Sequence, residues 1–311
     1  MSLLITGGSG YLASNILFRK KKNNVKILSS KLIDNLNDVN KFEVYNYASI
    51  DNNFSEILEG VDTVIHTAAL NANRSYNEKN LSKIINYDLT KKLFDACVKE
   101  NIKNFIFFST AHVYSNNLKG VINEKTPTSN IQSPYAKNKI NAENYLISNK
   151  KKINLKILRI SNVFGCSQIF DSNSASLLFN SFCLSALKSK KINILSKKNF
   201  KRNFITLYDF LNVIDYIINN ENKFKNIQII NIGSDITLSI LQAANIIKEI
   251  YYKLYNYKLP INYNFENYSN DDFNYDISLL KKTGFELVNN LEQTIEDTFN
   301  FYSKNINLYQ Y

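Results

Sequence analysis

The residues best suited to chemistry in this 311-residue chain are a tyrosine and a lysine four positions apart, Tyr135 and Lys139. They lie in residues 133–148, "SPYAKNKINAENYLIS", which predicts a helix that begins near Pro134. On a helix the two side chains are one turn apart on the same face. An ammonium group beside a phenol favours the phenolate and lowers its pKa. Tyr135 is therefore a candidate acid and base that exchanges a proton with a hydroxyl or carbonyl group while a hydride is transferred.

A hydroxyl group at the end of a strand completes this arrangement. The run "NFIFFST", residues 104–110, predicts a strand that ends in Thr110, with Ser109 as the alternative hydroxyl. Ligands bind at the carboxyl ends of parallel strands, so Thr110 could hydrogen-bond the oxygen that exchanges a proton with the phenol. Ala111 and His112 come next, and neither is a carboxylate. His112 is either a second proton donor that faces the substrate or a residue chosen for packing.

A glycine-rich segment near the start of the chain has the spacing of a dinucleotide-binding loop. "TGGSGYLA", residues 6–13, satisfies G-x-G-x-x-G/A, follows an apolar run at 2–6, and opens a predicted helix over 13–22. Glycines let the backbone turn and approach a pyrophosphate, whose charge lies at the helix N-terminus. The cofactor-binding residues expected here are Gly7, Gly8, Gly10, Tyr11, Leu12 and Ala13.

The end of the second strand bears on the choice of cofactor. The run "VKIL", residues 25–28, predicts a strand, and an NAD site would place an Asp or Glu at its end. Ser29, Ser30 and Lys31 stand there instead, and two hydroxyls with a cation suit a 2′-phosphate. We therefore expect NADP(H), with NAD(H) possible. The alternative is that this short loop is misaligned, since Asp34 follows three to five residues late.

The elements that must position these groups alternate over the first 165 residues. Strands are predicted at 2–6, 25–28, 61–69, 104–110 and 155–165, with helices at 13–22, 81–100 and 133–148. This order predicts an α/β fold with a Rossmann-type, doubly wound parallel sheet. We expect a dinucleotide-binding domain over 1–165 and a smaller α/β substrate-binding lobe over 166–311. Segments around 203–235 are expected to return to the main sheet.

The formal charge of +11, from 38 Lys and Arg against 27 Asp and Glu, does not by itself indicate nucleic-acid binding. The basic clusters at 20–22, 150–152 and 197–198 lie between predicted elements, without interleaved aromatic residues. A solvated surface that attracts an anionic substrate fits them better, and no nucleic-acid partner is expected.

Cysteines, histidines and apolar runs limit the class of protein further. Cys97, Cys166 and Cys183 form no CxxC, and His66 and His112 are the two histidines, so neither a metal site nor disulfides are expected. No run of about 18 apolar residues predicts a membrane span. The first ten residues do not resemble a signal peptide. We expect a reduced, cytoplasmic protein.

Several stretches in order resemble one family. They are "TGGSGYLA", "VIHTAA", "FFSTAHVYS", "PYAKNK", "RISNVFG", "RNFITLYD" and the terminal "DISLLKKTGFEL". The chain resembles the extended short-chain dehydrogenases/reductases, the NAD-dependent epimerases and dehydratases that modify nucleotide sugars, as in polysaccharide biosynthesis. The resemblance covers nearly the whole chain.

The resemblance implies roles for particular residues. Tyr135 would be the acid and base, Lys139 would tune it and hold the nicotinamide ribose, and Thr110 would orient the substrate. Two further pairs follow from the same motifs: Ala68 and Ala69 against the cofactor, and Asn162 and Arg202 on the nucleotide diphosphate. A homodimer formed through the helices at 81–100 and 133–148 is also implied.

The residues after Thr110 narrow the reaction. The family's 4,6-dehydratases carry Asp and Glu there, and its decarboxylases carry Glu at the position of His112. Because this chain has Ala111 and His112, we expect hydride chemistry at one carbon of a nucleotide-linked sugar. NADPH-dependent reduction of a 4-keto sugar is favoured. The alternative is a 4-epimerase with tightly bound NAD, and a minor alternative is a non-catalytic cofactor-binding relative.

Overall fold

The computed structural model describes residues 2–20, 24–30, 42–46, 54–114, 119–128, 131–167, 174–266 and 273–309. The chain forms two compact units. The first comprises Met1–Asn117, Glu124–Ile160 and Glu221–Ile230, and the second comprises Leu118–Asn123, Ser161–Asn220 and Asn231–Tyr311. The chain therefore passes between the units several times rather than at one boundary.

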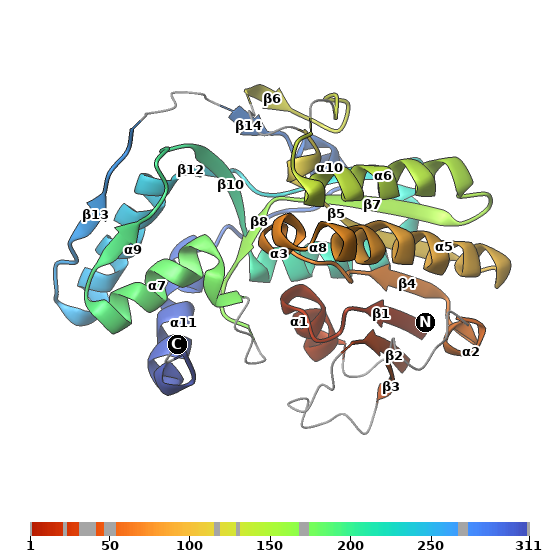
Figure 1. The fold of residues 1–311 in the computed structure, drawn as a ribbon, viewed down its shortest axis with the longest axis horizontal. Helices are drawn as coiled ribbons and strands as arrows, with labels where there is room; N and C mark the ends of the chain where they lie inside the picture. Colours follow the sequence, from red (N-terminus) through yellow and green to blue (C-terminus); the bar gives the residue numbers. More distant parts are fainter. Residues whose placement is uncertain are drawn as a thin grey trace. The chain divides into compact units, whose positions relative to one another are not determined.

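The first unit is built on a seven-stranded sheet in the order β11-β7-β5-β4-β1-β2-β3 (Figure 1). Neighbours from β7 to β3 pair in parallel, which confirms the Rossmann-type fold. The strands are β1 (Ser2–Thr6), β2 (Asn24–Ser29), β3 (Phe42–Asn46), β4 (Thr63–His66), β5 (Asn104–Thr110), β7 (Asn154–Ile160) and β11 (Ile229–Ile232). The sequence interpretation did not include β3.

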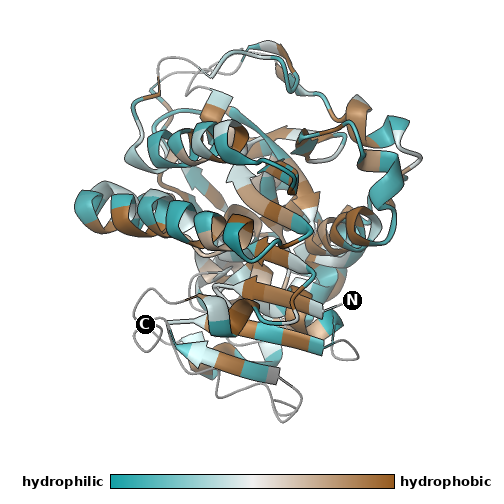
Figure 2. Cartoon of the chain, turned by 90° about the vertical axis from the view of Figure 1, so that its right-hand side faces the viewer, coloured by the Kyte–Doolittle hydropathy of each residue, from teal (hydrophilic) through white to brown (hydrophobic). Residues whose placement is uncertain are grey.

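Continuous apolar runs explain why these strands are buried on both faces. All seven residues of β5 are buried, and so are all four of β4. Runs of this kind are typical of parallel strands covered by helices on both sides, and Figure 2 shows hydrophobic residues gathered along the strands. In the parallel register Thr6 pairs with His66, and Thr110 with Ile160, so the carboxyl ends of these strands lie at one edge.

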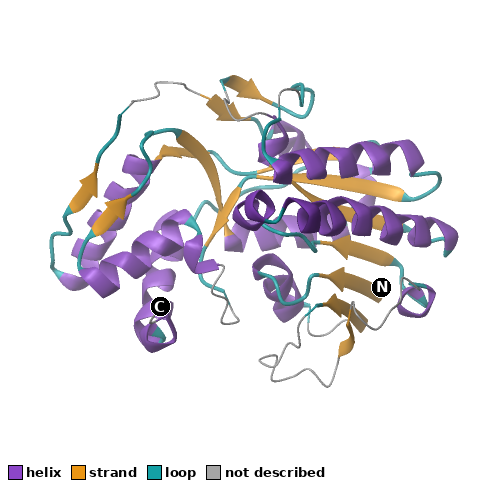
Figure 3. Ribbon diagram, in the orientation of Figure 1, coloured by secondary structure: helices purple, strands orange, loops and turns teal. Residues whose placement is uncertain are grey.

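Helices of the first unit lie beside this sheet (Figure 3). They are α1 (Tyr11–Arg19), α2 (Ser55–Leu58), α3 (Ala72–Asn77), α4 (Lys79–Lys83), η3 (Ile84–Asp88), α5 (Leu89–Lys99), η4 (Ala111–Tyr114), α6 (Pro134–Asn149) and η6 (Glu221–Phe224). Helix α6 begins at Pro134 as predicted. The homodimer expected through α5 and α6 stays a prediction.

The predicted helix over 81–100 contains a π-helical turn, η3, between α4 and α5. The turn places the side chain of Asn86 in the interior, where its Oδ1 accepts from the Leu70 amide at 2.7 Å and its Nδ2 donates to the Leu70 carbonyl at 3.1 Å. Such turns often occur where a helix serves a site. Here the turn fixes the segment that follows β4.

The second unit contains three smaller sheets, β12-β10-β8, β13-β9 and β14-β6. Their strands are β6 (Gly120–Ile122), β8 (Asn162–Phe164), β9 (Ile192–Ile194), β10 (Lys201–Thr206), β12 (Ile236–Ser239), β13 (Ile261–Tyr263) and β14 (Phe273–Tyr275). The helices are η5 (Ser174–Ser176), α7 (Leu178–Ser189), α8 (Leu207–Asn219), α9 (Ile240–Tyr255), α10 (Ser278–Lys282), α11 (Leu291–Lys304) and η7 (Ile306–Tyr309).

An aromatic cluster stabilises the second unit. The ring of Phe179 lies 4.4 Å from that of Phe164 and 5.0 Å from that of Phe204, measured between centroids. These rings join α7 to β8 and β10.

The strand predicted over 155–165 is two strands, β7 and β8, in different sheets, because the chain leaves the main sheet at Ser161.

No helix in the described part of the chain has both the length and the apolar character needed to cross a bilayer.

Candidate active site

The loop between β1 and α1 is closed by main-chain hydrogen bonds. The amide groups of Gly7 and Gly8 donate to the Leu28 carbonyl at 2.7 and 3.4 Å, and the Gly10 amide donates to the Gly7 carbonyl at 2.8 Å. Gly7 has a φ of +74°, and a Cβ there would lie 2.8 Å from the Cα of Ala68. The loop therefore requires glycine at residue 7 for both its backbone angle and its close approach to the segment that follows β4.

The N-terminus of α1 suits an anion. Gly10 caps the helix without a side-chain hydrogen bond, and the first amide groups of any helix have no intrahelical acceptor. Ala13 is buried, while Tyr11 and Leu12 are half-buried. This arrangement fits the pyrophosphate of a dinucleotide.

The segment after β4 is attached to the glycine loop. The Ala68 amide donates to Thr6 Oγ1 at 3.2 Å, and Thr67 Oγ1 donates to the Thr6 carbonyl at 2.7 Å. Ala68 is buried and Ala69 is exposed. The structure thus brings Ala68 beside Gly7, two candidate cofactor residues that lie about 60 positions apart in the sequence.

His66 is a structural residue of this edge. Its Nδ1 lies 2.7 Å from Thr6 Oγ1 and its Nε2 lies 2.8 Å from Thr90 Oγ1, and its ring stacks on Phe107 at 5.8 Å. Burial, with a smaller effect of the Lys139 charge, lowers the pKa of His66 to about 3. The imidazole is therefore neutral near pH 7 and links β4 to β1 through Thr6, to α5 through Thr90 and to β5 through the Phe107 ring.

The end of β2 carries two of the three residues expected to choose the cofactor. Ser29 is buried and pairs with Asn46 of β3, whereas Ser30 is exposed. Lys31 lies outside the described residues. Of the two described positions, Ser30 is the exposed one.

Thr110, Tyr135 and His112 lie together at the carboxyl end of β5. The hydroxyl groups of Thr110 and Tyr135 lie close enough to interact. Thr110 Oγ1 also accepts from the His112 amide at 3.3 Å, and the ring of His112 meets that of Tyr135 edge-on, with centroids 6.4 Å apart. Thr110 is buried, Tyr135 is half-buried and His112 is exposed. The strand-end hydroxyl and the phenol can therefore contact one substrate oxygen together.

Lys139 is enclosed beneath this pair. It is 2% exposed, and its Nζ donates to the Phe108 carbonyl at 2.7 Å and lies 4.6 Å from the centroid of the Phe107 ring. Burial lowers the pKa of Lys139 to about 7, and the negative charge of Glu143 opposes that shift. The charged, ammonium form of Lys139 is therefore only partly populated at neutral pH.

The expectation that Lys139 lowers the pKa of Tyr135 is wrong for this structure. Burial raises the pKa of Tyr135 to about 12, and the hydrogen bond with Thr110 only partly offsets that rise. Lys139 is not among the groups that shift it. The reason is that burial disfavours the charged phenolate, while the lysine donates to a main-chain carbonyl.

Sequence reasoning missed a carboxylate and a guanidinium next to these groups. Glu143 is fully buried and forms an ion pair with Arg159, whose Nη2 lies 2.6 Å from Glu143 Oε2. One signal was available, because Glu143 follows Lys139 by one helical turn. A second was the charged Arg159 in the middle of an apolar strand.

Asn162 and Arg202 lie on neighbouring strands of the second unit. Asn162 Nδ2 donates to the Asn203 carbonyl at 2.8 Å, within the parallel pair of β8 and β10. The guanidinium of Arg202 lies 4.7 Å from the centroid of the Phe200 ring, and burial lowers its pKa. Both residues are half-buried, so each retains surface that a ligand could contact.

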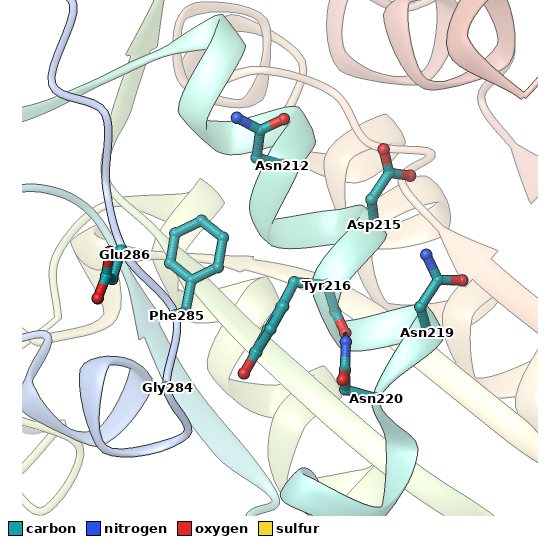
Figure 4. A pocket seen from close by; sticks show the side chains of 8 residues that line it. All are labelled: Asn212, Asp215, Tyr216, Asn219, Asn220, Gly284, Phe285 and Glu286. Atoms are coloured by element: carbon teal, nitrogen blue, oxygen red, sulfur yellow. Dashed lines mark hydrogen bonds between the residues drawn. The ribbon is translucent and has the colours of Figure 1, made fainter.

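A pocket in the second unit is lined by residues other than those expected in the active site. Figure 4 shows its lining, which comes from α8 and the segment 284–286: Asn212, Asp215, Tyr216, Asn219, Asn220, Gly284, Phe285 and Glu286. Tyr216 donates its hydroxyl proton to the Thr283 carbonyl at 2.6 Å and packs edge-on against Phe285. None of the expected site residues lines this pocket.

Comparison with known proteins places the chain in a family. A sequence model of the NAD dependent epimerase/dehydratase family matches residues 3–233. ADP-L-glycero-D-manno-heptose-6-epimerase of Brachyspira hyodysenteriae is 27% identical over 265 residues, covering 80% of this chain and 81% of the relative. UDP-N-acetylglucosamine 4-epimerase from Methanobrevibacter ruminantium, solved with UDP-N-acetylmuramic acid, is 26% identical with a TM-score of 0.79 and 98% of each chain covered.

A second solved structure shares the fold. UDP-glucuronic acid 4-epimerase from Bacillus cereus, solved with UDP-glucuronic acid and NAD, has a TM-score of 0.80 at 21% identity, covering 98% of this chain and 100% of that chain. The match of the family to residues 3–233 includes the glycine loop, the strand-end threonine and the tyrosine–lysine pair. The chain belongs to the NAD dependent epimerase/dehydratase family of enzymes.

Proposed function

We propose that this enzyme epimerises a nucleotide-linked sugar by oxidising one sugar carbon and reducing it again on the opposite face. The observation that carries the proposal is the contact between Thr110 and Tyr135, with Lys139 one turn along the same helix. The relatives support it, since the solved structures with which this chain shares its fold include 4-epimerases with bound UDP-sugars. The strongly positive net charge favours an anionic substrate of this kind.

The residues of the site divide the reaction between them. The glycine loop and α1 would hold the dinucleotide, whose nicotinamide, when bound, accepts a hydride from the sugar carbon and returns it. Tyr135 removes the proton of the sugar hydroxyl and later gives it back, while Thr110 hydrogen-bonds the same oxygen. Because burial raises the pKa of Tyr135 to about 12, the phenolate needs a nearby cation. We assign that role to Lys139, which lies one turn away on the same face of α6 and in this structure donates to the Phe108 carbonyl.

The positions after Thr110 favour epimerisation over loss of water. Elimination requires an acid and a base in addition to the group that exchanges the hydroxyl proton. Ala111 supplies a methyl group, and His112 supplies an exposed imidazole beside Tyr135. We therefore assign no dehydration step, and His112 is placed at the rim of the site.

A second candidate is an NADPH-dependent reductase of a 4-keto sugar. The observation that favours it is the end of β2, where Ser29 and Ser30 replace the acid that binds the ribose 2′-hydroxyl in an NAD site. Against it stands the NAD bound in the structurally similar 4-epimerase. NAD is therefore the cofactor we propose, with NADP(H) as the alternative.

One experiment separates the two candidates. The purified enzyme is denatured, the released dinucleotide is identified by mass, and the native enzyme is then incubated with UDP-hexoses without added cofactor. Retained NAD and interconversion of two epimers are expected. An empty protein that binds NADPH more tightly than NADH and converts no epimer would replace the epimerase with the reductase. Tyr135→Phe serves as the inactive control for turnover.

A further inference from the structure

A buried carboxylate joins the elements that carry the reactive groups. Glu143 lies on α6, one turn beyond Lys139 and two turns beyond Tyr135. Its Oε1 accepts a hydrogen bond from the hydroxyl of Ser109, which directly precedes Thr110 on β5. The carboxylate therefore links the helix that carries the phenol and the ammonium to the strand that carries the threonine.

A guanidinium fixes the carboxylate from the next strand. Arg159 of β7 pairs with Ser109 in the parallel register, its Nε lies 3.2 Å from each Glu143 oxygen, and its Nη2 lies 2.6 Å from Oε2. The Tyr114 ring covers the guanidinium with its centroid 4.7 Å from Cζ, and Nη1 donates to the Glu124 carbonyl at 3.4 Å. The Glu143 side chain is 0% exposed and that of Arg159 is 5% exposed.

Stability alone does not account for this ion pair. Desolvation of two buried charges offsets most of their attraction, and apolar residues of similar size often stabilise a fold as well. The ion pair also has a buried ionisable neighbour, because Lys139 lies one helical turn from Glu143. An apolar pair could not influence the charge of this lysine. A negative charge at that distance favours a protonated lysine.

The groups around Lys139 differ in the charge that they offer. From its own helix Glu143 acts on it, from β5 it meets the Phe108 carbonyl and the Phe107 ring, and from β4 the neutral His66. Beyond Glu143, β7 contributes the positive Arg159. Glu143 is the group whose charge opposes the effect of burial on Lys139.

We propose that Glu143 is a positioning residue of this active site, which keeps Lys139 charged and in register with Thr110 and is itself held by Arg159. The inference rests on the proposed function in assigning a role to the lysine charge. It adds that the charge depends on a carboxylate which touches neither substrate nor cofactor. Arg159 determines how much of that carboxylate's charge the lysine experiences.

Two substitutions shift the same ionisation in opposite directions. Glu143→Gln keeps the size of the side chain and a group that can accept from Ser109, but it removes the negative charge. Lys139 then loses its proton at lower pH, and the alkaline fall in turnover moves down by about one pH unit or more. Arg159→Gln removes the positive charge and leaves the carboxylate uncompensated, so the alkaline fall moves up.

The test measures the pH profile of turnover and, separately, the titration of Lys139 by carbon-13 NMR of labelled lysine side chains, assigned with Lys139→Met. Opposite displacements of the Lys139 titration in the two variants are expected. Equal losses of turnover at every pH, with an unchanged titration, would overturn the inference. If Glu143→Gln does not fold, Glu143→Asp replaces it. This variant keeps the charge, so an unshifted titration is then expected, and a downward shift as large as neutralisation predicts overturns the inference.

The NMR readout also separates this inference from the proposed function. A wild-type enzyme that converts no nucleotide sugar would refute the function, yet the displaced Lys139 titration would still establish the electrostatic link. If the wild-type enzyme is active but the Lys139 titration is unchanged in both variants, the inference alone is refuted.

Discussion

Thr110, Tyr135 and Lys139 in the first unit are held by buried partners from two strands and a helix, whereas Asn162 and Arg202 in the second unit lie half-buried on one small sheet. In the first unit, Lys139 donates to the Phe108 carbonyl and Thr110 accepts from the His112 amide. In the second, the Arg202 guanidinium contacts an aromatic ring. This difference fits the roles proposed for these residues, since proton transfer needs fixed distances, whereas binding of a phosphate by Arg202 would tolerate adjustment of a long side chain.

The largest expected effect tests the first unit. Tyr135→Phe should lower turnover at least about 100-fold, the scale of lost acid–base catalysis, while cofactor and substrate binding stay near normal. Tyr145→Phe is a matched control, because this tyrosine lies on the same helix and bonds the exposed Asp95 at 2.6 Å. Steady-state kinetics and calorimetry provide the measurements. Turnover near that of the wild type in Tyr135→Phe would remove the proposed mechanism.

The next effect tests the second unit. Arg202→Ala should raise KM for the nucleotide sugar by about 10-fold or more while kcat changes little, because charge-assisted hydrogen bonds to phosphate contribute to binding throughout the reaction. Lys201→Ala, one residue earlier on β10, is the control. If kcat fell and KM did not change, Arg202 would belong with the reactive groups, and the contrast between the units would fail.

A pair of glycines separates backbone strain from close contact. Gly60→Ala should lower the free energy of unfolding by about 1–2 kcal/mol, since its φ is +66° and no atom lies within 4 Å of the added Cβ. Gly7→Ala has a similar φ but also meets Ala68, so it should lose about 1–3 kcal/mol more and weaken dinucleotide binding. Chemical unfolding and cofactor titration check both. Equal effects of the two substitutions would show that the Ala68 contact is unimportant.

The effect that is smallest per step, and that builds up over several pH units, concerns the neutral His66. Because its folded pKa of about 3 is below the ordinary value, the unfolded chain binds a proton first, so the folded state loses stability as pH falls from 6.5 towards 3. The slope should reach up to about 1.4 kcal/mol per pH unit. His66→Gln should flatten that slope. Unfolding measured at several pH values checks this outcome.

Much of the fold could be predicted from local patterns. The apolar runs, the glycine loop and Pro134 at the start of α6 depend on neighbours within one strand or one helical turn, and the structure has the expected elements there. The sequence predicted one strand over 155–165, whereas the structure has two, β7 and β8. Their division depends on pairing partners that are distant in the sequence.

The sequence by itself determined which reactive groups this protein has and how they are spaced along single elements. Only the tertiary structure decided their states. Lys139 donates to a carbonyl 31 positions away, and His66 is neutral between two hydroxyl groups. Glu143 is buried in an ion pair with Arg159 of β7 instead of being solvated. The physical reason is that burial and the charges of distant neighbours set a pKa, and both depend on how the helices pack against the sheet.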